Sequence, residues 1–330
     1  MGMKPNELRD SLKGVIHLVM TPFNDKNELD EAALASCLKK EVQMYKGQDL
    51  VFLAGGSTAE FYAMNDVEFK RYAKTCVEAI GGKFPVVVAA GRGGTSYSLE
   101  LSKYVQDVGG DGVMVVNPYY HPATKEGIYR HLETIANNLD IGVVLYNNPA
   151  TSSMWVDIEL MKKVSKIKNV VGLKENIGDI KTLYRMYRTI DPQDMAVFTG
   201  VGHEMYQYAA LFGMKGFVTE LANFAPEEAF NIYKAAMKKD FGKVQELCEK
   251  VDPIYAFIGE VASRRSPIPS TSSFGIVGAG APYYQSVIKT AMELVGLPGG
   301  KVREPMENLA AAEKDELRQI MLKIGLNVVA

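Results

Sequence analysis

The octapeptide Asn169-Val-Val-Gly-Leu-Lys-Glu-Asn176 has the composition of a short buried strand that ends in a lysine. Its apolar part, residues 170–173, is long enough for a strand covered on both faces. Lys174 follows this run, where burial disfavours an ammonium ion, so we expect its pKa to fall towards neutrality. A neutral lysine can attack a ketone and form a Schiff base. Taken alone, the octapeptide favours an ordinary strand-end lysine that reaches water or pairs with Glu175; the rest of the sequence reverses that preference.

The side chains of this strand are expected to alternate between its two faces. Val170, Gly172 and Lys174 then share one face, and Val171 and Leu173 share the other. Because Gly172 carries no side chain, we expect it to leave space beside the stem of the lysine.

The composition is that of a globular protein with little net charge. Of 330 residues, 47% are hydrophobic and 23% are charged, and the net charge is -2. This balance argues against nucleic acid or an anionic membrane as a partner, and no apolar run approaches the ~20 residues of a membrane span. The three cysteines lie far apart in sequence, which predicts a cytoplasmic location without disulfides. The four histidines show no zinc-binding spacing, so we expect no metal.

Short runs rich in Val, Ile and Leu alternate with longer stretches that carry apolar residues at three- and four-residue intervals. The short runs are typical of parallel strands covered on both sides, and the longer stretches of amphipathic helices. This repetition predicts an α/β fold, a (β/α)8 TIM barrel over residues 12–225, followed by a C-terminal helical extension over residues 226–330. The expected strands are 14–20, 50–54, 85–90, 112–116, 141–146, 170–174, 195–198 and 216–219; the extension has helices at 226–239, 241–259, 285–297 and 311–324 and a Ser- and Pro-rich loop at 264–274.

The catalytic groups of such barrels lie at the carboxyl ends of the strands, where this sequence places several polar residues. Tyr146 and Lys174 end neighbouring strands, so their backbones are expected to lie ~5 Å apart. A phenol in that place can donate and accept the protons that carbinolamine formation requires. The segment Gly56-Ser57-Thr58 offers N–H groups and hydroxyls for a substrate carboxylate. Each feature alone is more often structural, but their presence on one rim favours the catalytic interpretation.

Five motifs in the same order resemble those of the dihydrodipicolinate synthase / N-acetylneuraminate lyase family of Schiff-base aldolases. The family's TPF strand, GxTGE loop, TPYY segment, YNxP turn and GxK strand are matched, in turn, by Thr21-Pro-Phe23, Gly56-Ser-Thr-Ala-Glu60, Asn117-Pro-Tyr-Tyr120, Tyr146-Asn-Asn-Pro149 and Val171-Gly-Leu-Lys-Glu175. Ala59 stands where the family's loop usually has glycine. The match is specific for the fold and for Schiff-base chemistry, and less specific for the substrate.

The resemblance implies roles for four catalytic residues. Lys174 would form a Schiff base with the ketone of pyruvate or another 2-oxo acid, and Tyr146 would shuttle protons. Thr58 would relay these protons together with Tyr120, a residue that often comes from the neighbouring subunit in this family. A homodimer or homotetramer is therefore expected. Because the iminium itself is the electron sink, no cofactor is implied.

The resemblance also points to the substrate contacts. The backbone of Gly56 and Ser57 would hold the 2-oxo carboxylate. Dihydrodipicolinate synthases carry an arginine five residues after the YNxP tyrosine, and exchanging that guanidinium fork for the hydroxyl found here is not conservative. Arg92 is the basic residue to consider as a replacement. The remaining expected contacts are Thr151 at the arginine position, Gly200 and Val218, with His203 and Glu204 as looser matches.

We therefore expect an aldolase or dehydratase that acts on a 2-oxo acid, with a 2-keto-3-deoxy sugar acid as the favoured substrate. The Gly-Gly-Ser-Thr loop at 55–58 resembles neuraminate lyases, and segments 54–64 and 223–226 resemble ketodeoxyglucarate dehydratases. One alternative is the condensation of pyruvate with an aldehyde, as in dihydrodipicolinate synthase. Another, from a different class, is a non-catalytic barrel that binds a keto acid; the lysine–tyrosine pair argues against it, since a binder needs no buried nucleophile.

Overall fold

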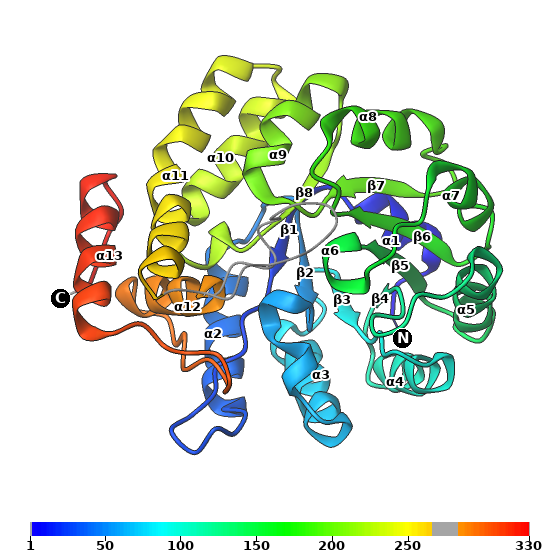
Figure 1. Cartoon of the computed structure of the whole chain (residues 1–330), viewed down its shortest axis with the longest axis horizontal. Helices are drawn as coiled ribbons and strands as arrows, with labels where there is room; N and C mark the ends of the chain where they lie inside the picture. Colours follow the sequence, from blue (N-terminus) through cyan, green and yellow to red (C-terminus); the bar gives the residue numbers. More distant parts are fainter. Residues whose placement is uncertain (1, 266–282, 330) are drawn as a thin grey trace.

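Parallel strands form a closed barrel that is surrounded by helices (Figure 1). The computed structural model describes residues 2–265 and 283–329. Each strand pairs with the next one along the chain, and β8 pairs with β1, so the predicted (β/α)8 barrel is confirmed. The strands are β1 (Gly14–Leu18), β2 (Leu50–Ala54), β3 (Val86–Ala89), β4 (Gly112–Val116), β5 (Gly142–Asn147), β6 (Val170–Glu175), β7 (Ala196–Thr199) and β8 (Gly216–Thr219).

Five of the barrel helices begin at a side chain that accepts a hydrogen bond from a backbone N–H group. Asp30, Asn65 and Thr124 each accept one from the residue three positions later, at 2.9–3.0 Å. Asp157 and Asp179 cap later helices in the same way. The helices are α2 (Glu31–Met44), α3 (Asp66–Ile80), α4 (Thr95–Asp107), α5 (Lys125–Asn137), α7 (Ile158–Val164), α8 (Ile180–Thr189), α9 (Gly202–Ala209) and α10 (Pro226–Met237).

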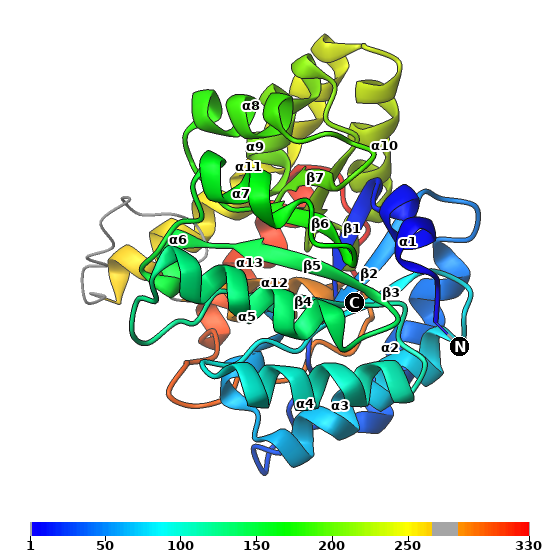
Figure 2. The same ribbon diagram turned by 90° about the vertical axis from the view of Figure 1, so that its right-hand side faces the viewer.

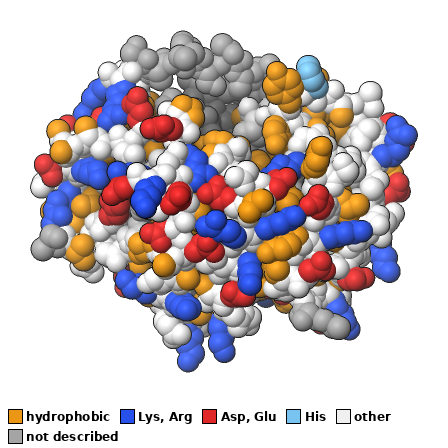
Figure 3. Space-filling view, turned by 90° about the horizontal axis from the view of Figure 1, so that it is seen from below, with side chains coloured by type: hydrophobic (Ala, Val, Ile, Leu, Met, Phe, Trp, Pro, Cys, Tyr) orange, Lys and Arg blue, Asp and Glu red, His pale blue; other side chains and the backbone are white. Residues whose placement is uncertain are grey.

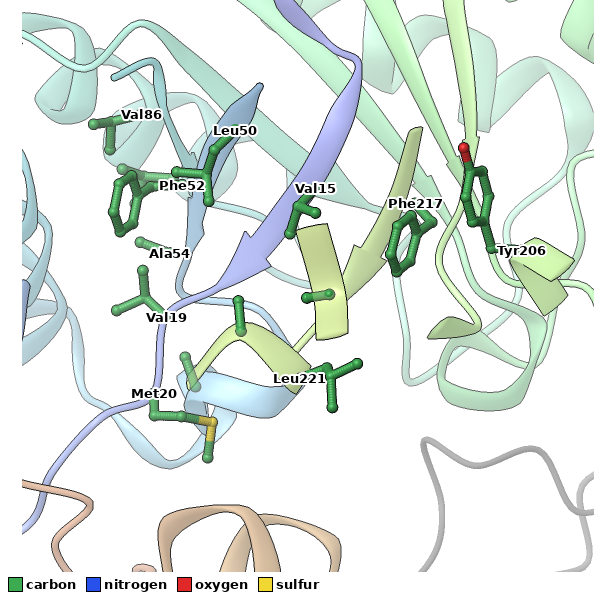
Figure 4. Close-up of a cluster of buried hydrophobic side chains, with 14 of the residues drawn as sticks. Val15, Val19, Met20, Leu50, Phe52, Ala54, Val86, Tyr206, Phe217 and Leu221 are labelled. Carbon is green, nitrogen blue, oxygen red and sulfur yellow. The ribbon is translucent and has the colours of Figure 1, made fainter. Parts of the chain in front are cut away.

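The strands are buried on both faces, which explains why their sequences are apolar at nearly every position. Outward-facing side chains such as Val15, Phe52 and Phe217 pack between the barrel and its helices (Figure 4). Inward-facing side chains, among them Ile16 and Val51, fill the interior of the barrel. The interior of the barrel is thus a packed core and not a pore.

A short helix that the sequence analysis did not predict, α1 (Pro5–Ser11), closes the amino-terminal end of the barrel. Leu8 and the following Leu12 are buried among the interior side chains. A Cβ added at Gly172 would lie 2.7 Å from Leu12 Cδ1. The space expected beside the stem of Lys174 at this glycine is therefore filled by Leu12, and Gly172 serves packing.

A β-bulge in β6 changes the alternation expected for this strand. The register between β5 and β6 shifts at Val143/Val144, which leaves Val171 as the extra residue on β6. Val171 joins the interior side chains, whereas Val170 and Leu173 pack outward. The predicted face of residues 170 and 171 is therefore wrong, because a bulge reverses the alternation on one side of itself.

The C-terminal extension consists of α11 (Phe241–Arg264), α12 (Tyr284–Leu294) and α13 (Ala311–Lys323). Figures 1 and 2 show α13 on the side of the barrel opposite α5 and α7. Helix α11 continues past the expected end at residue 259, and the predicted loop 264–274 lies outside the described residues from 266 onwards. Helix α10 contacts β1 and so takes the place of the eighth barrel helix; the division of the chain at residue 225 stays a prediction.

The face of the molecule drawn in Figure 3 carries acidic and basic side chains that are interspersed. This mixture agrees with the net charge of -2. Across the described ranges, no helix has the length and apolar character that crossing a membrane requires.

Candidate active site

Lys174 and Tyr146 lie side by side at the mouth of the barrel. They are paired in the register of β5 and β6, as the sequence predicted for two adjacent strand ends. The Lys174 Nζ lies 4.1 Å from the centre of the Tyr146 ring. Both side chains are buried, with 3% of each exposed. A nucleophile and a phenol are therefore held in contact and shielded from bulk water.

The environment of Lys174 favours its neutral form. Burial lowers the pKa of Lys174 from 10.5 to about 7, and the carboxylate of Glu220 partly opposes this shift. The neighbouring Glu175 is no partner for the lysine, because its Oε2 accepts a 2.8 Å hydrogen bond from Asn147 Nδ2 on the outer face of the barrel. The ordinary structural role of a strand-end lysine paired with Glu175 is thus ruled out by geometry.

Tyr146 is held as a neutral phenol. Asn148 Nδ2 donates a hydrogen bond to its hydroxyl at 2.7 Å. Burial raises the pKa of Tyr146 to about 12, while hydrogen bonds with Ser57 and Asn148 act in the opposite direction. The hydroxyl beside Tyr146 is therefore that of Ser57. The sequence analysis had assigned this place in the relay to Thr58, one residue further along the loop.

The loop after β2 forms a 3₁₀ turn, η1 (Ser57–Ala59), and its first two residues line the cavity at the mouth of the barrel. The N–H groups that open such a turn have no partner within it and suit a carboxylate. Thr58 Oγ1 lies 3.2 Å from the hydroxyl of Tyr284, the first residue of α12. Gln285 Nε2 donates a 3.3 Å hydrogen bond to the carbonyl of Ser57. Helix α12 therefore forms part of the wall of the site.

A buried ion pair fixes the same loop to the same helix. Lys289 of α12 and Glu60 are 1% and 0% exposed, and the lysine Nζ donates to the Glu60 carboxylate. The backbone N–H of Arg303 donates to Glu60 Oε2 at 2.8 Å. Glu60 has a left-handed backbone with φ of 56°, which a non-glycine residue adopts when its surroundings compensate. The extension thus positions the hydroxyl-bearing loop.

Gly200, expected to contact the substrate, also makes room for the nucleophile. A Cβ at this position would lie 2.7 Å from Lys174 Cε and 1.8 Å from Asn176 Oδ1. Glycine is therefore required here by the close approach of both Asn176 and the lysine. Asn176 is buried, and its Oδ1 has no hydrogen-bond partner among the described residues.

These residues surround a cavity of about 250 Å³ at the carboxyl ends of the strands. The lining also includes five polar side chains that the sequence analysis did not propose as site residues: Glu220, Tyr255, Tyr284, Asn176 and Gln285. The sequence contained a signal for Glu220. Side chains alternate along β8, so a residue two positions after the inward-facing Val218 is expected on the same side, at the mouth of the barrel. The tyrosines come from α11 and α12, and nothing local in the sequence marks them. The predicted residues that line the cavity are Ser57, Thr58, Tyr146, Lys174, Gly200, His203 and Glu204.

Several other predicted site residues lie elsewhere. Val218 is buried in the barrel interior, below the cavity. Thr151 is exposed on the short helix α6 (Pro149–Ser152), and its hydroxyl donates to Asn148 O. Tyr120 is 85% exposed and does not line the cavity. Arg92 is paired with Asp66 at 3.1 Å and stacks on Phe69, outside the cavity. Gly56 is buried at the start of the loop.

No group of three His, Cys, Asp or Glu side chains suited to a metal ion occurs in the part of the chain that the structure describes. The titratable side chains that line the cavity are those of Lys174, His203, two glutamates (Glu204 and Glu220) and three tyrosines (Tyr146, Tyr255 and Tyr284).

A parallel barrel with a buried lysine at the end of its sixth strand and a phenol at the end of the fifth defines a class of Schiff-base enzyme. The sequence model of the dihydrodipicolinate synthetase family matches residues 11–278, and the chain belongs to that family. The resemblance seen in the motifs is thereby confirmed. As a member of this family the protein is a lyase. The alternative of a non-catalytic barrel that only binds a keto acid is therefore set aside.

Among its relatives are two 4-hydroxy-tetrahydrodipicolinate synthases that are each 29% identical. The one from Acetivibrio thermocellus aligns over 93% of this chain and 96% of its own length, and the one from Methanopyrus kandleri over 96% and 97%. The crystal structure of YagE, a prophage protein of the dihydrodipicolinic acid synthase family from Escherichia coli in complex with pyruvate, is 25% identical. It has a TM-score of 0.81 and covers 96% of this chain and 99% of its own.

Proposed function

We propose that this protein is a lyase that binds pyruvate or another 2-oxo acid as a Schiff base on Lys174 and acts on a bond next to it. The observation that carries the proposal is the burial of Lys174 against Tyr146, which lowers the pKa of the lysine to about 7. A large fraction of the amine is then neutral and nucleophilic near neutral pH. Support comes from YagE, which was crystallised with pyruvate.

The first steps follow from the contacts of these two residues. The Nζ lone pair attacks C2 of the keto acid, the C–N bond forms, and the carbonyl electron pair moves to oxygen. That oxygen takes the proton of Tyr146, whose pKa of about 12 keeps it protonated beforehand. Loss of water then gives the iminium, which withdraws electrons from C3. In this scheme the first N–H groups of the Ser57–Ala59 turn hold the carboxylate.

We further propose that the substrate beyond C3 is a hydroxylated chain, as in a 2-keto-3-deoxy sugar acid. The described lining carries two carboxylates, Glu204 and Glu220, and no arginine. Arg92 and Thr151 both lie outside the cavity. A second carboxylate on the substrate would meet like charges there, whereas hydroxyls find acceptors.

A second candidate is the condensation of pyruvate with an aldehyde that bears a carboxylate, such as aspartate semialdehyde. The names of the relatives at 29% identity favour it. The two candidates separate in one assay series: pyruvate with the semialdehyde, and keto-deoxy sugar acids in the cleavage direction. A kcat/KM above ~10,000 M⁻¹s⁻¹ for the semialdehyde, the low end of the usual enzyme range, would refute the hydroxylated substrate.

The Schiff base is tested by borohydride reduction in the presence of pyruvate, followed by peptide mass spectrometry. We expect one adduct, on Lys174, and its loss together with turnover in Lys174→Ala. Trapping at another lysine, or no trapping in the wild-type protein, would overturn the proposal.

We also propose a homo-oligomer, a dimer or a tetramer. Tyr120 is 85% exposed and stands edge-on to His121, with ring centres 4.9 Å apart, as suits a side chain that crosses to a neighbouring subunit. Sedimentation of the active protein at assay concentration tests this, and a fully active monomer would contradict it.

A further inference from the structure

The proposed chemistry places a negative charge on Tyr146 for part of each cycle. When this phenol gives its proton to the former carbonyl oxygen of the substrate, the electron pair of the O–H bond stays on the phenol oxygen. The Tyr146 side chain is 3% exposed, and burial raises its pKa to about 12, because a buried phenolate is poorly solvated. Groups that donate hydrogen bonds to this oxygen therefore influence how readily the proton leaves.

Asn148 is one such donor. Its Nδ2 lies 2.7 Å from the hydroxyl oxygen of Tyr146, and its side chain is buried. The hydrogen bond with Asn148, like that with Ser57, lowers the pKa of Tyr146 and so opposes the effect of burial. An amide N–H does not release its proton near neutral pH, so Asn148 donates to the phenol and to the phenolate alike. The hydroxyl proton of Tyr146 is then left free to reach the substrate.

Asn148 makes this contact in place of the usual role of an asparagine at its position. It is the N-cap of the one-turn helix α6, where an asparagine side chain ordinarily accepts a hydrogen bond from the helix backbone. Within the described chain its side chain makes no such bond. The backbone of Asn148 is extended, so its side chain lies on the same side as that of Tyr146, two residues earlier. The family's YNxP motif leaves this position open, and the amide is therefore a feature of this chain.

The surroundings of Asn148 hold its amide in place. Its carbonyl accepts hydrogen bonds from the hydroxyl and the backbone N–H of Ser152, at 2.7 and 3.1 Å. The side chain of the neighbouring Asn147 binds both the N–H and the carbonyl of Val156, at 2.9 and 3.0 Å, which closes the loop between them. Asn148 is not among the described residues that line the cavity. It therefore acts on the reaction through Tyr146.

We propose that Asn148 is a positioning residue of this site, whose amide N–H stabilises the phenolate of Tyr146 during proton transfer. The O–H bond of Tyr146 breaks, and the proton goes to the oxygen on C2 of the substrate. The electron pair stays on the phenol oxygen, where the Nδ2–H of Asn148 donates a hydrogen bond. The next proton that Tyr146 accepts restores the phenol, and Asn148 itself neither gains nor loses a proton. This inference rests on the proposed Schiff base and adds to it a residue that does not touch the substrate.

The test uses the exchange of pyruvate methyl protons in D2O, followed by NMR, because this exchange requires the Schiff base and its enamine. Its dependence on pyruvate concentration gives a maximal rate and a half-saturating concentration. Asn148→Leu removes the donor and nearly keeps the volume of the side chain. We expect the maximal rate to fall ~10- to 100-fold, as for the loss of a hydrogen bond to a charged group. The half-saturating concentration should stay nearly the same, because Asn148 does not line the cavity.

Asn138→Leu is the matched control, since it removes an amide from the surface of the protein. The exposed Asn138 donates from its Nδ2 to the carbonyl of Thr134 at 2.9 Å. We expect this variant to change neither the maximal rate nor the half-saturating concentration.

A double-mutant cycle separates the proposed role from a general effect on the fold. In a Tyr146→Phe background no phenolate forms, so we expect Asn148→Leu to slow exchange no further. A residue that only supports the loop would slow exchange by the same factor in both backgrounds. Asn148→Asp keeps the shape of the side chain but offers a carboxylate to the phenol oxygen. We expect it to be at least as slow as Asn148→Leu, and it serves as the second variant should the leucine protein not fold.

Three results would overturn the assignment: a wild-type maximal rate in Asn148→Leu, an equal loss caused by this change in the Tyr146→Phe background, or a wild-type rate in Asn148→Asp. Each of them leaves the Schiff base intact when borohydride traps pyruvate on Lys174 of the wild-type protein. A wild-type protein without that adduct would instead refute the proposed function.

Discussion

Replacing Lys174 by methionine should stabilise the folded protein, in spite of abolishing its proposed chemistry. The ammonium form is hydrated in the unfolded chain and disfavoured in the folded one, where burial lowers the pKa from 10.5 to about 7. Each pKa unit is worth about 1.4 kcal/mol. At pH 7 the buried lysine therefore costs the fold about 4 kcal/mol relative to a side chain that does not titrate.

The pH dependence of the stability difference between Lys174→Met and the wild-type protein shows whether the lowered pKa of Lys174 is its cause. Between the two pKa values the unfolded chain binds more protons at this site than the folded chain, so the stability of the wild-type protein rises with pH in that interval. The advantage of Lys174→Met should shrink by about 2 kcal/mol between pH 7 and pH 9. The apolar burial of the methionine contributes equally at both values. Urea denaturation of the two proteins at each pH measures the difference.

A second buried lysine is the matched control. Lys289 is 1% exposed but is paired with Glu60, so Lys289→Met leaves a buried carboxylate without its partner. We expect this variant to lose about 3–5 kcal/mol, the opposite sign. A Lys174→Met protein that is less stable than the wild type at pH 7, or whose difference does not change with pH, would refute the reasoning.

Three further predictions concern activity. Tyr146→Phe should slow pyruvate proton exchange ~100- to 10,000-fold, and an unchanged rate would return the residue to a packing role. Gly200→Ala should block adduct formation, because its Cβ would lie 2.7 Å from Lys174 Cε. Gly178→Ala is the control, since a Cβ at that position meets no atom within 4 Å. Trapping of the adduct in the Gly200 variant at the wild-type rate would contradict the steric requirement. The rate of borohydride trapping with limiting pyruvate should rise with pH through about 7, since the neutral amine attacks and the pKa of Lys174 is lowered to that value; a rate that is flat across this interval is the contrary result.

The alternation of apolar runs with amphipathic stretches was sufficient to predict the barrel. Parallel strands buried on both faces leave that pattern in the sequence, and consecutive β/α units place neighbouring strands side by side. The pairing of Tyr146 with Lys174 follows from this order alone, because the last residues of adjacent strands meet at one rim. The lowered pKa of Lys174 was also predictable, since it depends on burial at a strand end.

Tertiary structure decided the features that depend on register and on distant segments. The 3₁₀ turn after β2 turns Ser57 towards Tyr146 and Thr58 towards Tyr284, a difference of one residue that the spacing does not fix. The one-turn helix α6 leaves Thr151 exposed to solvent, whereas the motif match had placed it among the substrate contacts.

The part of the cavity lining that comes from the C-terminal extension is the clearest case. Glu220 follows β8, but Tyr255 and Tyr284, which line the cavity with it, come from helices that begin at residues 241 and 284. Their convergence results from long-range packing of the C-terminal extension over the barrel mouth, reinforced by the buried pair of Lys289 and Glu60. Local periodicity determines which segments become strands and helices; the contacts between segments far apart in the chain determine which side chains meet at the site.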